Sequence, residues 1–429
     1  MIKIVEAEAD RVQITSRKDE TFAQVVSGVE NIIMAVRTLG DIAVFELTEK
    51  FDGVRLSSLR VSENEILEAY NSINKDFVDT LEKAKKNIEQ FHKEQYKAQL
   101  KKAFEIKRET GEVVGQKVMP LNRAGIYVPG GTAAYPSTVL MNAIPAKIAG
   151  VKEIVMVTPP DKNGKVNPYI LAAARVAGVD KIFKVGGAQA VAALAYGTES
   201  IPKVDKITGP GNVFVAEAKR QVFGLVDIDM IAGPSEILVI ADQSANPSYV
   251  AADMLSQAEH DKNAAAILIT TSKELAGKVK VELEIQLDKL PRNEIARASI
   301  ENNGRIIIAK NLDEAIDLSN EIAPEHLELC VSDPFALLDK VQNAGSVFLG
   351  SYTPEAVGDY FAGANHTLPT SGSAKYASAL SVDDFMKKTQ YVFYTRVALE
   401  RDAGRISDFA RREGLDGHAN SVTIRTERL

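Results

Sequence analysis

The feature that most constrains this chain is a unit repeated after Gly125. Each copy has a short run of β-branched and apolar residues, then a turn rich in glycine or proline, then an alanine-rich stretch. Three successive copies pair residues 153–158 with 167–177, 181–185 with 188–196, and 205–208 with 212–223. A strand that rejoins its sheet through a helix lies parallel to the strand before it. The repeat therefore predicts parallel βαβ structure.

A second series of strand-like runs follows the first. Its runs are residues 237–241, 265–270, 305–309 and 346–349, with helices such as 249–259 between them. We therefore expect an α/β fold with two doubly wound, Rossmann-like parallel sheets. Ligands of such sheets bind beyond the carboxyl ends of the strands, so the loops after the strands are the expected sites.

The two ends of the chain do not show this repeated pattern of strand and helix. Residues 20–115 read as helices with charged faces, for example 77–99, where apolar positions recur at helical spacing. The tail from Ala377 is mostly polar and helical and ends in the segment GLDGHANSV. We expect a helical N-terminal segment and an extended C-terminal tail, an arm of the kind that reaches another subunit.

Composition excludes several classes of protein. The 429 residues are too many for one ordinary core, and 45% hydrophobic and 25% charged residues are typical of globular domains. The net charge of -7 includes no basic stripe, so nucleic acid is not an expected partner. No run approaches the ~20 apolar residues that cross a bilayer, so we expect no membrane partner. The acidic N-terminus is unlike a signal peptide, which makes the cytoplasm the expected location.

Cysteine and histidine narrow the chemistry. The single cysteine, Cys330, excludes an internal disulfide and lies in an apolar run, which favours a buried, inert thiol. Four of the five histidines follow residue 259, each beside acidic, amide or glycine residues. They are His260, His326, His366 and His418.

Gln257 and His260 are three residues apart at the end of an alanine-rich helix. This spacing puts them on one helical face and suits two ligands of one metal, with Asp359 as a candidate third. A Gln-x-x-His pair also occurs by chance in many helices, so the spacing leaves metal binding and ordinary packing equally open.

Glu325 and His326 are adjacent and follow Pro324. A neighbouring carboxylate and imidazole can divide acid and base duties when burial moves their pKa values toward neutrality. The alternative is a glutamate at a helix N-terminus beside an incidental histidine.

Glycine-rich turns stand at residues 128–131, 186–187 and 209–212, each between a strand and a helix candidate. Such turns let backbone N–H groups face a phosphate. None is a Gly-x-Gly-x-x-Gly, because Phe214 stands where the third glycine of the last turn belongs. Ordinary tight turns remain an equal interpretation.

Long segments of the chain resemble the histidinol dehydrogenase family. They are AGIYVPGGTAAYPSTVLMNAIPAKIAG, VGGAQAVAALAYGTESIPKVDKITGPGN, VDIDMIAGPSEILVIAD, DMLSQAEHD, APEHLEL, GDYFAGANHTLPT and GLDGHANS. The resemblance runs in order from about residue 20 to the end. Because long runs coincide rather than one short pattern, it is specific.

The resemblance implies a homodimer with shared active sites that binds one Zn²⁺ per site, NAD⁺ and L-histidinol. The implied metal ligands are Gln257, His260 and Asp359 of one subunit and His418 of the other. The implied substrate pocket contains these four residues together with Ser235, His326, His366 and Glu413. The implied NAD⁺ contacts are Tyr127, Gln189 and Asn212.

The resemblance also implies a four-electron oxidation. His326 takes the hydroxyl proton while a hydride leaves for NAD⁺, and the aldehyde stays bound. Glu325 then activates water, His326 removes a second proton, and a second NAD⁺ accepts the second hydride. The product is histidine.

Two other classes remain open from the residues alone. A zinc hydrolase needs a similar metal site and a water-activating glutamate, and a two-lobed binding protein needs only the fold. NADH formation would exclude both. For the domains we expect an arm at 1–20, a catalytic α/β domain of 21–120 plus 235–376, an NAD-side domain of 121–234, and a dimer-exchanging tail at 377–429.

Overall fold

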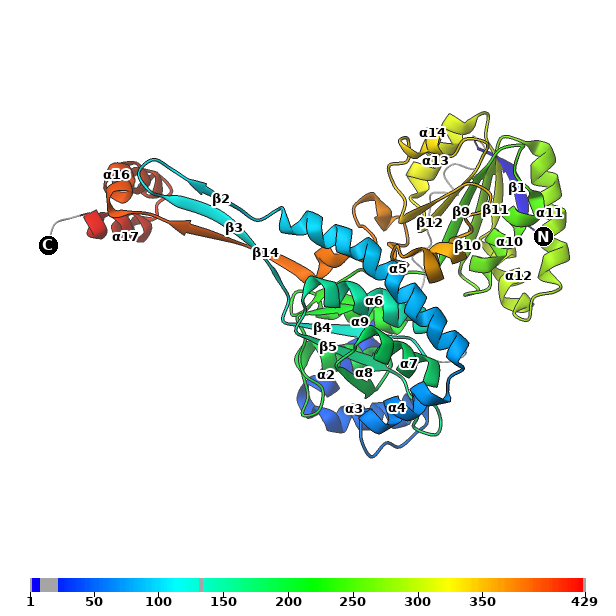
Figure 1. Cartoon of the computed structure of the whole chain (residues 1–429), viewed down its shortest axis with the longest axis horizontal. Helices are drawn as coiled ribbons and strands as arrows, with labels where there is room; N and C mark the ends of the chain where they lie inside the picture. The colour runs from blue at the N-terminus through cyan, green and yellow to red at the C-terminus, as the bar shows by residue number, and fades with distance from the viewer. Residues whose placement is uncertain (1, 8–21, 131–133, 427–429) are drawn as a thin grey trace. The chain divides into compact units, whose positions relative to one another are not determined.

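The computed structural model describes residues 2–7, 22–130 and 134–426. Residues 8–20 of the expected arm and Gly131 of the first glycine turn lie outside the described residues. The chain forms two compact units, one of residues 1–93 and 121–385 and the other of residues 94–120 and 386–429. Figure 1 shows the helices and strands that make up the two units.

The first unit contains a five-stranded parallel sheet with the order β6-β5-β4-β7-β8. Its strands are β4 (Arg123–Tyr127), β5 (Glu153–Thr158), β6 (Lys181–Lys184), β7 (Lys206–Thr208) and β8 (Asp227–Ile228). The helices between them are α6 (Pro136–Ala149), α7 (Pro168–Ala177), α8 (Gly187–Tyr196) and α9 (Val213–Val222). The chain adds β5 and β6 on one side of β4 and then β7 and β8 on the other, so the strand order reverses between β4 and β7. The three repeated units of the sequence are confirmed.

The N-terminal helices pack on this five-stranded sheet. They are α2 (Phe22–Leu39), α3 (Asp41–Asp52), α4 (Glu63–Ser72) and α5 (Lys75–Leu100). Val29 and Val36 of α2 are buried in one core with Val191 and Leu194 of α8, and α4 packs against α7. This packing differs from the expected grouping of residues 21–120 with 235–376, because the apolar stripe of α2 is buried against the alanine-rich surface of α8.

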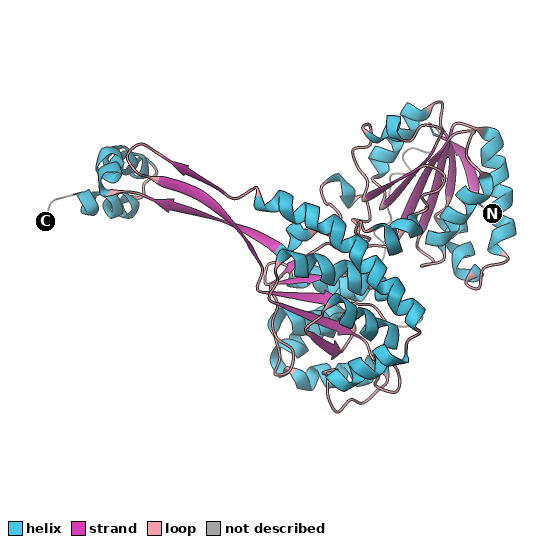
Figure 2. Cartoon of the chain, in the orientation of Figure 1, coloured by secondary structure: helices cyan, strands magenta, loops and turns pink. Residues whose placement is uncertain are grey.

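The first unit also contains a six-stranded parallel sheet with the order β1-β11-β10-β9-β12-β13. Its strands are β1 (Lys3–Glu6), β9 (Glu236–Ala241), β10 (Ala265–Thr270), β11 (Arg305–Ile308), β12 (His326–Cys330) and β13 (Ser346–Leu349). Helices α10 (Pro247–Ala258), α11 (Lys273–Leu287) and α12 (Asn293–Asn302) share one core with the sheet, and α13 (Leu312–Ile322) and α14 (Phe335–Leu338) share the other. Figure 2 shows helices on both faces. The predicted pair of doubly wound sheets is therefore confirmed.

The second unit is built around an antiparallel sheet with the order β14-β3-β2. Its elements are β2 (Phe104–Lys107), β3 (Val113–Pro120), β14 (Met386–Phe393), α16 (Arg396–Arg412) and α17 (Asp416–Thr426). The helical expectation for residues 20–115 is therefore wrong after Leu100, and the tail begins with a strand. Strand β2 alternates apolar and polar residues over only four positions and β14 contains the polar run 387–390, so neither carries a strong strand signal.

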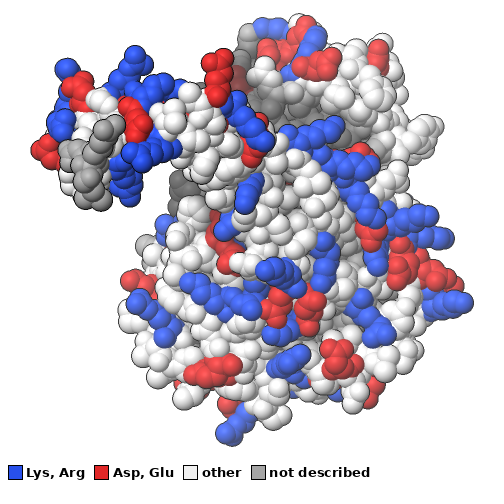
Figure 3. Space-filling model, turned by 60° about the vertical axis from the view of Figure 1, so that its left-hand side comes forward, with Lys and Arg blue, Asp and Glu red and all other residues white. Residues whose placement is uncertain are grey.

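The surface carries charge of both signs. On the face drawn in Figure 3, acidic and basic side chains are interspersed rather than gathered into one basic stripe. Among the described residues, no helix is both long and apolar enough to span a membrane.

Candidate functional site

Glu325 and His326 stand at the start of strand β12. Helix α13 ends at Ile322, and Ala323 takes a left-handed conformation (φ 53°) that turns the chain into the strand. Glu325 is 8% exposed and His326 is 3% exposed. The helix-terminus alternative for this pair is therefore wrong, because the two residues begin a buried strand.

Parallel pairing of β12 with β9 fixes both side chains. The backbone N–H of Glu236 donates to Oε2 of Glu325 at 2.9 Å, and Nδ1 of His326 lies 2.9 Å from the carbonyl oxygen of Glu236. Since Glu236 and His326 are the first residues of their strands, the pair lies at the amino edge of the six-stranded sheet. The expectation that the site follows the strands is wrong for this sheet.

Helix α10 brings Gln257 to the same edge. The helix begins with Pro247 after the Asn246 cap and ends at Ala258. Its carboxyl end returns to the amino edge because a crossover helix runs antiparallel to its strands. Gln257 is 1% exposed, and its carbonyl oxygen accepts from the backbone N–H of His260 at 3.1 Å. His260 follows the helix and is exposed.

Two short helical turns complete the cluster. Helix α15 (Glu355–Val357) leads into the π-helical turn η1 (Gly358–Ala362). Oδ1 of Asp359 lies 3.6 Å from Nε2 of His326, and Oε2 of Glu355 lies 4.0 Å from its Nδ1. Nε2 of Gln257 donates to the carboxylate of Glu355. The backbone carbonyl of Asp359 accepts from Nδ1 of His366 at 3.0 Å.

The structure thus brings Gln257, His326, Asp359 and His366 close together, and the family resemblance assigns these four residues to one pocket. Glu355, which is 3% exposed, is a member of the cluster that the sequence did not predict. The only available signal was its position four residues before Asp359, a spacing that puts two carboxylates on successive helical turns.

Burial and charge perturb the acid–base groups strongly. Burial raises the pKa of Glu325, although His326 and the N–H of Glu236 favour its charged form. Burial lowers the pKa of His326, but the carboxylates of Glu325, Asp359 and Glu355 outweigh burial and raise it. Burial raises the pKa of Asp359, but His326 outweighs burial and holds it below its usual range. The pKa values of both neighbours on the chain are therefore strongly perturbed, as is common at functional sites.

The side chains fit a divalent cation. Three carboxyl groups surround one imidazole, and buried negative charge is unfavourable without a compensating cation. Among the described residues, Oε1 of Gln257 and Nε2 of His326 are buried and lack a hydrogen-bond partner. Imidazole nitrogen and carboxylate oxygen are common zinc ligands, and an amide oxygen is compatible with zinc as well.

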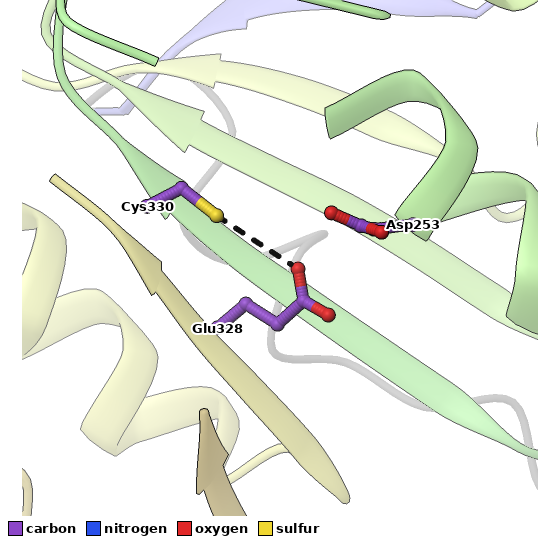
Figure 4. Close-up of side chains that lie close together, drawn as sticks. All are labelled: Asp253, Glu328 and Cys330. Carbon is purple, nitrogen blue, oxygen red and sulfur yellow. Dashed lines mark hydrogen bonds between the residues drawn. The ribbon is translucent and has the colours of Figure 1, made fainter. Parts of the chain in front are cut away.

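A second acidic cluster lies in the same half of the unit. Within the described ranges, Asp253 of α10 and Glu328 and Cys330 of β12 have potential ligand atoms within 4.8 Å of one another. Figure 4 shows the three side chains converging, with the thiol of Cys330 directed at Glu328. Cys330 is buried as predicted, and burial raises the pKa of its thiol. Burial also raises the pKa values of Asp253 and Glu328, whose side chains hydrogen-bond each other.

The expected NAD⁺ residues lie at the carboxyl edge of the five-stranded sheet. Tyr127 ends β4, and its Oη accepts from the N–H of Gly187 at 3.0 Å. Asn212 caps α9 by accepting from two backbone N–H groups, and Gln189 is 1% exposed within α8. This edge includes the reversal between β4 and β7, where doubly wound sheets bind nucleotides.

Of the remaining expected residues, one lies at the amino edge of the six-stranded sheet and two lie in the second unit. Ser235 is half-buried just before β9. Glu413 ends α16 and His418 lies in α17, both exposed in the second unit. Because that unit is described by itself, their meeting with the other residues stays a prediction.

Fold and site together define a class. A buried carboxylate–imidazole pair on one parallel sheet, combined with a reversal of strand order on another, is the arrangement expected of a two-sheet α/β dehydrogenase.

Comparison with known proteins narrows this class to one family. The sequence profile described as histidinol dehydrogenase matches residues 15–426. The histidinol dehydrogenase of Listeria monocytogenes is 57% identical over 407 residues, which cover 95% of this chain and 94% of that protein. That of Clostridium acetobutylicum is 53% identical over 412 residues, covering 96% and 95%. The crystal structure of histidinol dehydrogenase from Elizabethkingia anophelis has a TM-score of 0.91 at 38% identity and covers 99% of this chain and 98% of that one. The chain belongs to the histidinol dehydrogenase family.

Proposed function

We propose that this chain is a zinc-dependent enzyme that oxidises L-histidinol through L-histidinal to L-histidine with two NAD⁺, the final step of histidine biosynthesis. The observation that carries the proposal is the buried Glu325–His326 pair, in which Nδ1 of His326 lies 3.6 Å from Oε2 of Glu325. Family membership indicates the substrate, and the Glu325–His326 pair provides the groups for acid–base chemistry.

His326 and Glu325 divide the proton transfers. His326 accepts the hydroxyl proton in the first oxidation and a proton of the hydrated aldehyde in the second. Glu325 activates the water that hydrates the aldehyde. Both groups are nearly inaccessible to bulk solvent, which keeps the aldehyde enclosed between the two oxidations.

The proposed ligands of zinc are Gln257, His260 and Asp359, with His418 contributed by a second copy of the chain. The orphaned oxygen of Gln257 and the surplus of carboxylates around His326 support this assignment. When bound, zinc would orient the imidazole and amine of the substrate. Ser235, His366 and Glu413 are the proposed further substrate contacts.

NAD⁺ is the proposed hydride acceptor, bound near Tyr127, Gln189 and Asn212. The turn between β7 and α9 supports this placement because it presents a helix N-terminus at the reversal of the sheet. The cytoplasmic location expected from the sequence stays a prediction.

The direct test is the number of NADH molecules formed per L-histidinol consumed, with zinc supplied and after chelation. Two NADH per substrate, lost on chelation and restored by zinc, support the proposal. One NADH would mean that the aldehyde is released. None would exclude histidinol oxidation and reopen the hydrolase and binding-protein interpretations.

The proposed homodimer with shared sites needs its own test. His260→Ala and His418→Ala variants should each be inactive, and mixed dimers should regain activity because one of their two sites is then intact. Mixed dimers that remain inactive would place all four ligands within one chain.

A further inference from the structure

Glu355 is a buried carboxylate that the proposed reaction does not use. It is 3% exposed and comes from α15, a three-residue helix, so the surrounding elements must fix its position. Three donors or cations face it: the amide of Gln257, the hydroxyl of Ser256 and the ring of His326.

The contact with Gln257 determines which way that amide points. The atom of Gln257 that contacts Glu355 is Nε2, the donor, and an ionised carboxylate can only accept. The other amide atom, Oε1, is left buried without a hydrogen-bond partner among the described residues. An amide nitrogen that holds its hydrogens is not a metal ligand, whereas an amide oxygen is.

The position of Glu355 is fixed from beneath by the second acidic cluster. Its backbone N–H donates to Oε1 of Glu328 at 2.8 Å, and Glu328 also hydrogen-bonds Asp253. Asp253 and Gln257 lie one turn apart on α10. The cluster in Figure 4 therefore links α10 to β12, and the N–H of Glu355 links α15 to the same cluster.

We propose that Glu355 is a positioning residue for the metal site, because it holds Nε2 of Gln257 and so presents Oε1 as the ligand atom. The inference rests on the proposed zinc function. It assigns the Asp253–Glu328–Cys330 cluster to the support of Glu355.

The test exchanges the carboxylate of Glu355 with the amide of Gln257. Glu355→Gln removes the obligate acceptor, so zinc affinity should fall by about 10- to 100-fold, the usual effect of losing an outer partner of a ligand. In a Gln257→Glu background the same substitution should instead strengthen zinc binding. There, Nε2 of the new amide can donate to the new carboxylate, which leaves its second oxygen for the metal.

Zinc affinity is measured on the full-length protein by competition with a chromophoric chelator, together with the visible absorption of the Co²⁺-loaded form. The matched control is Glu217→Gln. Glu217 is an equally buried carboxylate of α9 that accepts from the amide of Gln221 at 2.7 Å, on the other sheet. This control should leave zinc affinity and the cobalt spectrum unchanged.

The opposite changes in zinc affinity that Glu355→Gln should cause in the two backgrounds distinguish the possible roles of Glu355. If Glu355 acted only through its charge, Glu355→Gln would weaken zinc binding in both backgrounds, and the inference would be overturned. If its role were only structural, the melting temperature of the metal-free protein would fall while zinc affinity stayed constant, which would overturn the inference as well. A wild-type protein that binds no zinc would overturn the proposed function itself, and the wild-type titration shows this before any variant is compared.

Discussion

Lys219 and Asp229 form an ion pair whose side chains are 2% and 0% exposed. Both members of the ion pair hydrogen-bond the backbone of Gly209. Nζ of Lys219 donates to its carbonyl at 3.0 Å, and its N–H donates to Oδ2 of Asp229 at 2.7 Å. Gly209 has φ +109°, and a Cβ there would stand 2.1 Å from the carbonyl oxygen of Tyr127. The ion pair therefore fixes the turn at the reversal of the five-stranded sheet, where we place NAD⁺.

Asp229→Asn should raise the KM for NAD⁺ about tenfold or more and change the KM for histidinol much less. The reason is that the turn loses its charged acceptor and shifts relative to β4. The unpaired Lys219 should also lower the free energy of unfolding by about 3 kcal/mol. Steady-state kinetics well below the melting temperature measure the first effect, and urea unfolding measures the second.

A double variant separates stability from binding. Lys219→Met with Asp229→Leu removes both charges and should recover most of the stability, but the KM for NAD⁺ should stay high. Asp384→Asn is the control, since it removes a partner of buried Lys206 at the other end of β7. If the double variant also restored the KM, the turn would not be the element that binds NAD⁺.

Gly358→Ala should lower kcat about tenfold or more without unfolding the protein. A Cβ at this position would stand 2.5 Å from the ring of Phe348, whose centroid lies 5.9 Å from that of His326. The displaced ring would then press on His326, and sub-ångström misplacement of a catalytic base is costly.

Phe348→Leu in the Gly358→Ala background should restore part of the loss by making room for the new methyl group. The matched control is Gly277→Ala in α11, where nothing lies within 4 Å of the new Cβ. That control should keep full activity and gain up to about 1 kcal/mol of stability. Unaltered kcat in Gly358→Ala would show that Phe348 moves away from His326 instead.

Glu325→Gln should block the second oxidation more than the first. Its amide cannot activate water, so aldehyde hydration should slow by about 10²- to 10⁴-fold, while His326 still serves the first step. With enzyme in excess over histidinol, stopped-flow absorbance should show one rapid NADH per substrate instead of two. His326→Asn should slow both steps. Two rapid NADH in Glu325→Gln would remove Glu325 from the water step.

Much of this architecture follows from local sequence. Strands β5 and β10 match their predicted ranges residue for residue because each is a short apolar run that ends at turn residues. Strands β2 and β14 of the antiparallel sheet escaped prediction because the alternation of β2 spans only four residues and β14 contains a polar run.

The site itself was only partly predictable. The adjacency of Glu325 and His326 is visible in the sequence, but their place at the amino edge depends on the pairing of β12 with β9, a contact across about 90 residues. The only signal of Glu355 was its spacing of four residues from Asp359, which is weak because a glutamate after a proline is ordinary until a sheet and a helix enclose it. Long-range pairing therefore decides which carboxylates become functional.

The raised pKa of buried Asp253 predicts a pH dependence of stability. Burial raises the pKa of Asp253 to about 6, above its value in the unfolded chain. A group with a raised folded-state pKa contributes stability that is fully present below the unfolded value of about 4 and is lost as the pH rises through about 6. Asp253→Asn removes this group and gives Glu328 an amide donor. The variant should therefore gain stability over the wild type as the pH rises, by on the order of 1–2 kcal/mol at pH ~8.

Urea unfolding of the metal-free protein between pH ~4 and ~8, with chelator present, measures the difference between variant and wild type. The free energy of unfolding of the variant minus that of the wild type should rise between pH ~4 and ~6 and then level off. Asp339→Asn, at an exposed position after α14, should give a flat difference over the same range. A flat difference for Asp253→Asn as well would mean that Asp253 is already ionised in the folded protein at low pH. In that case the cluster behind Gln257 would carry a net negative charge.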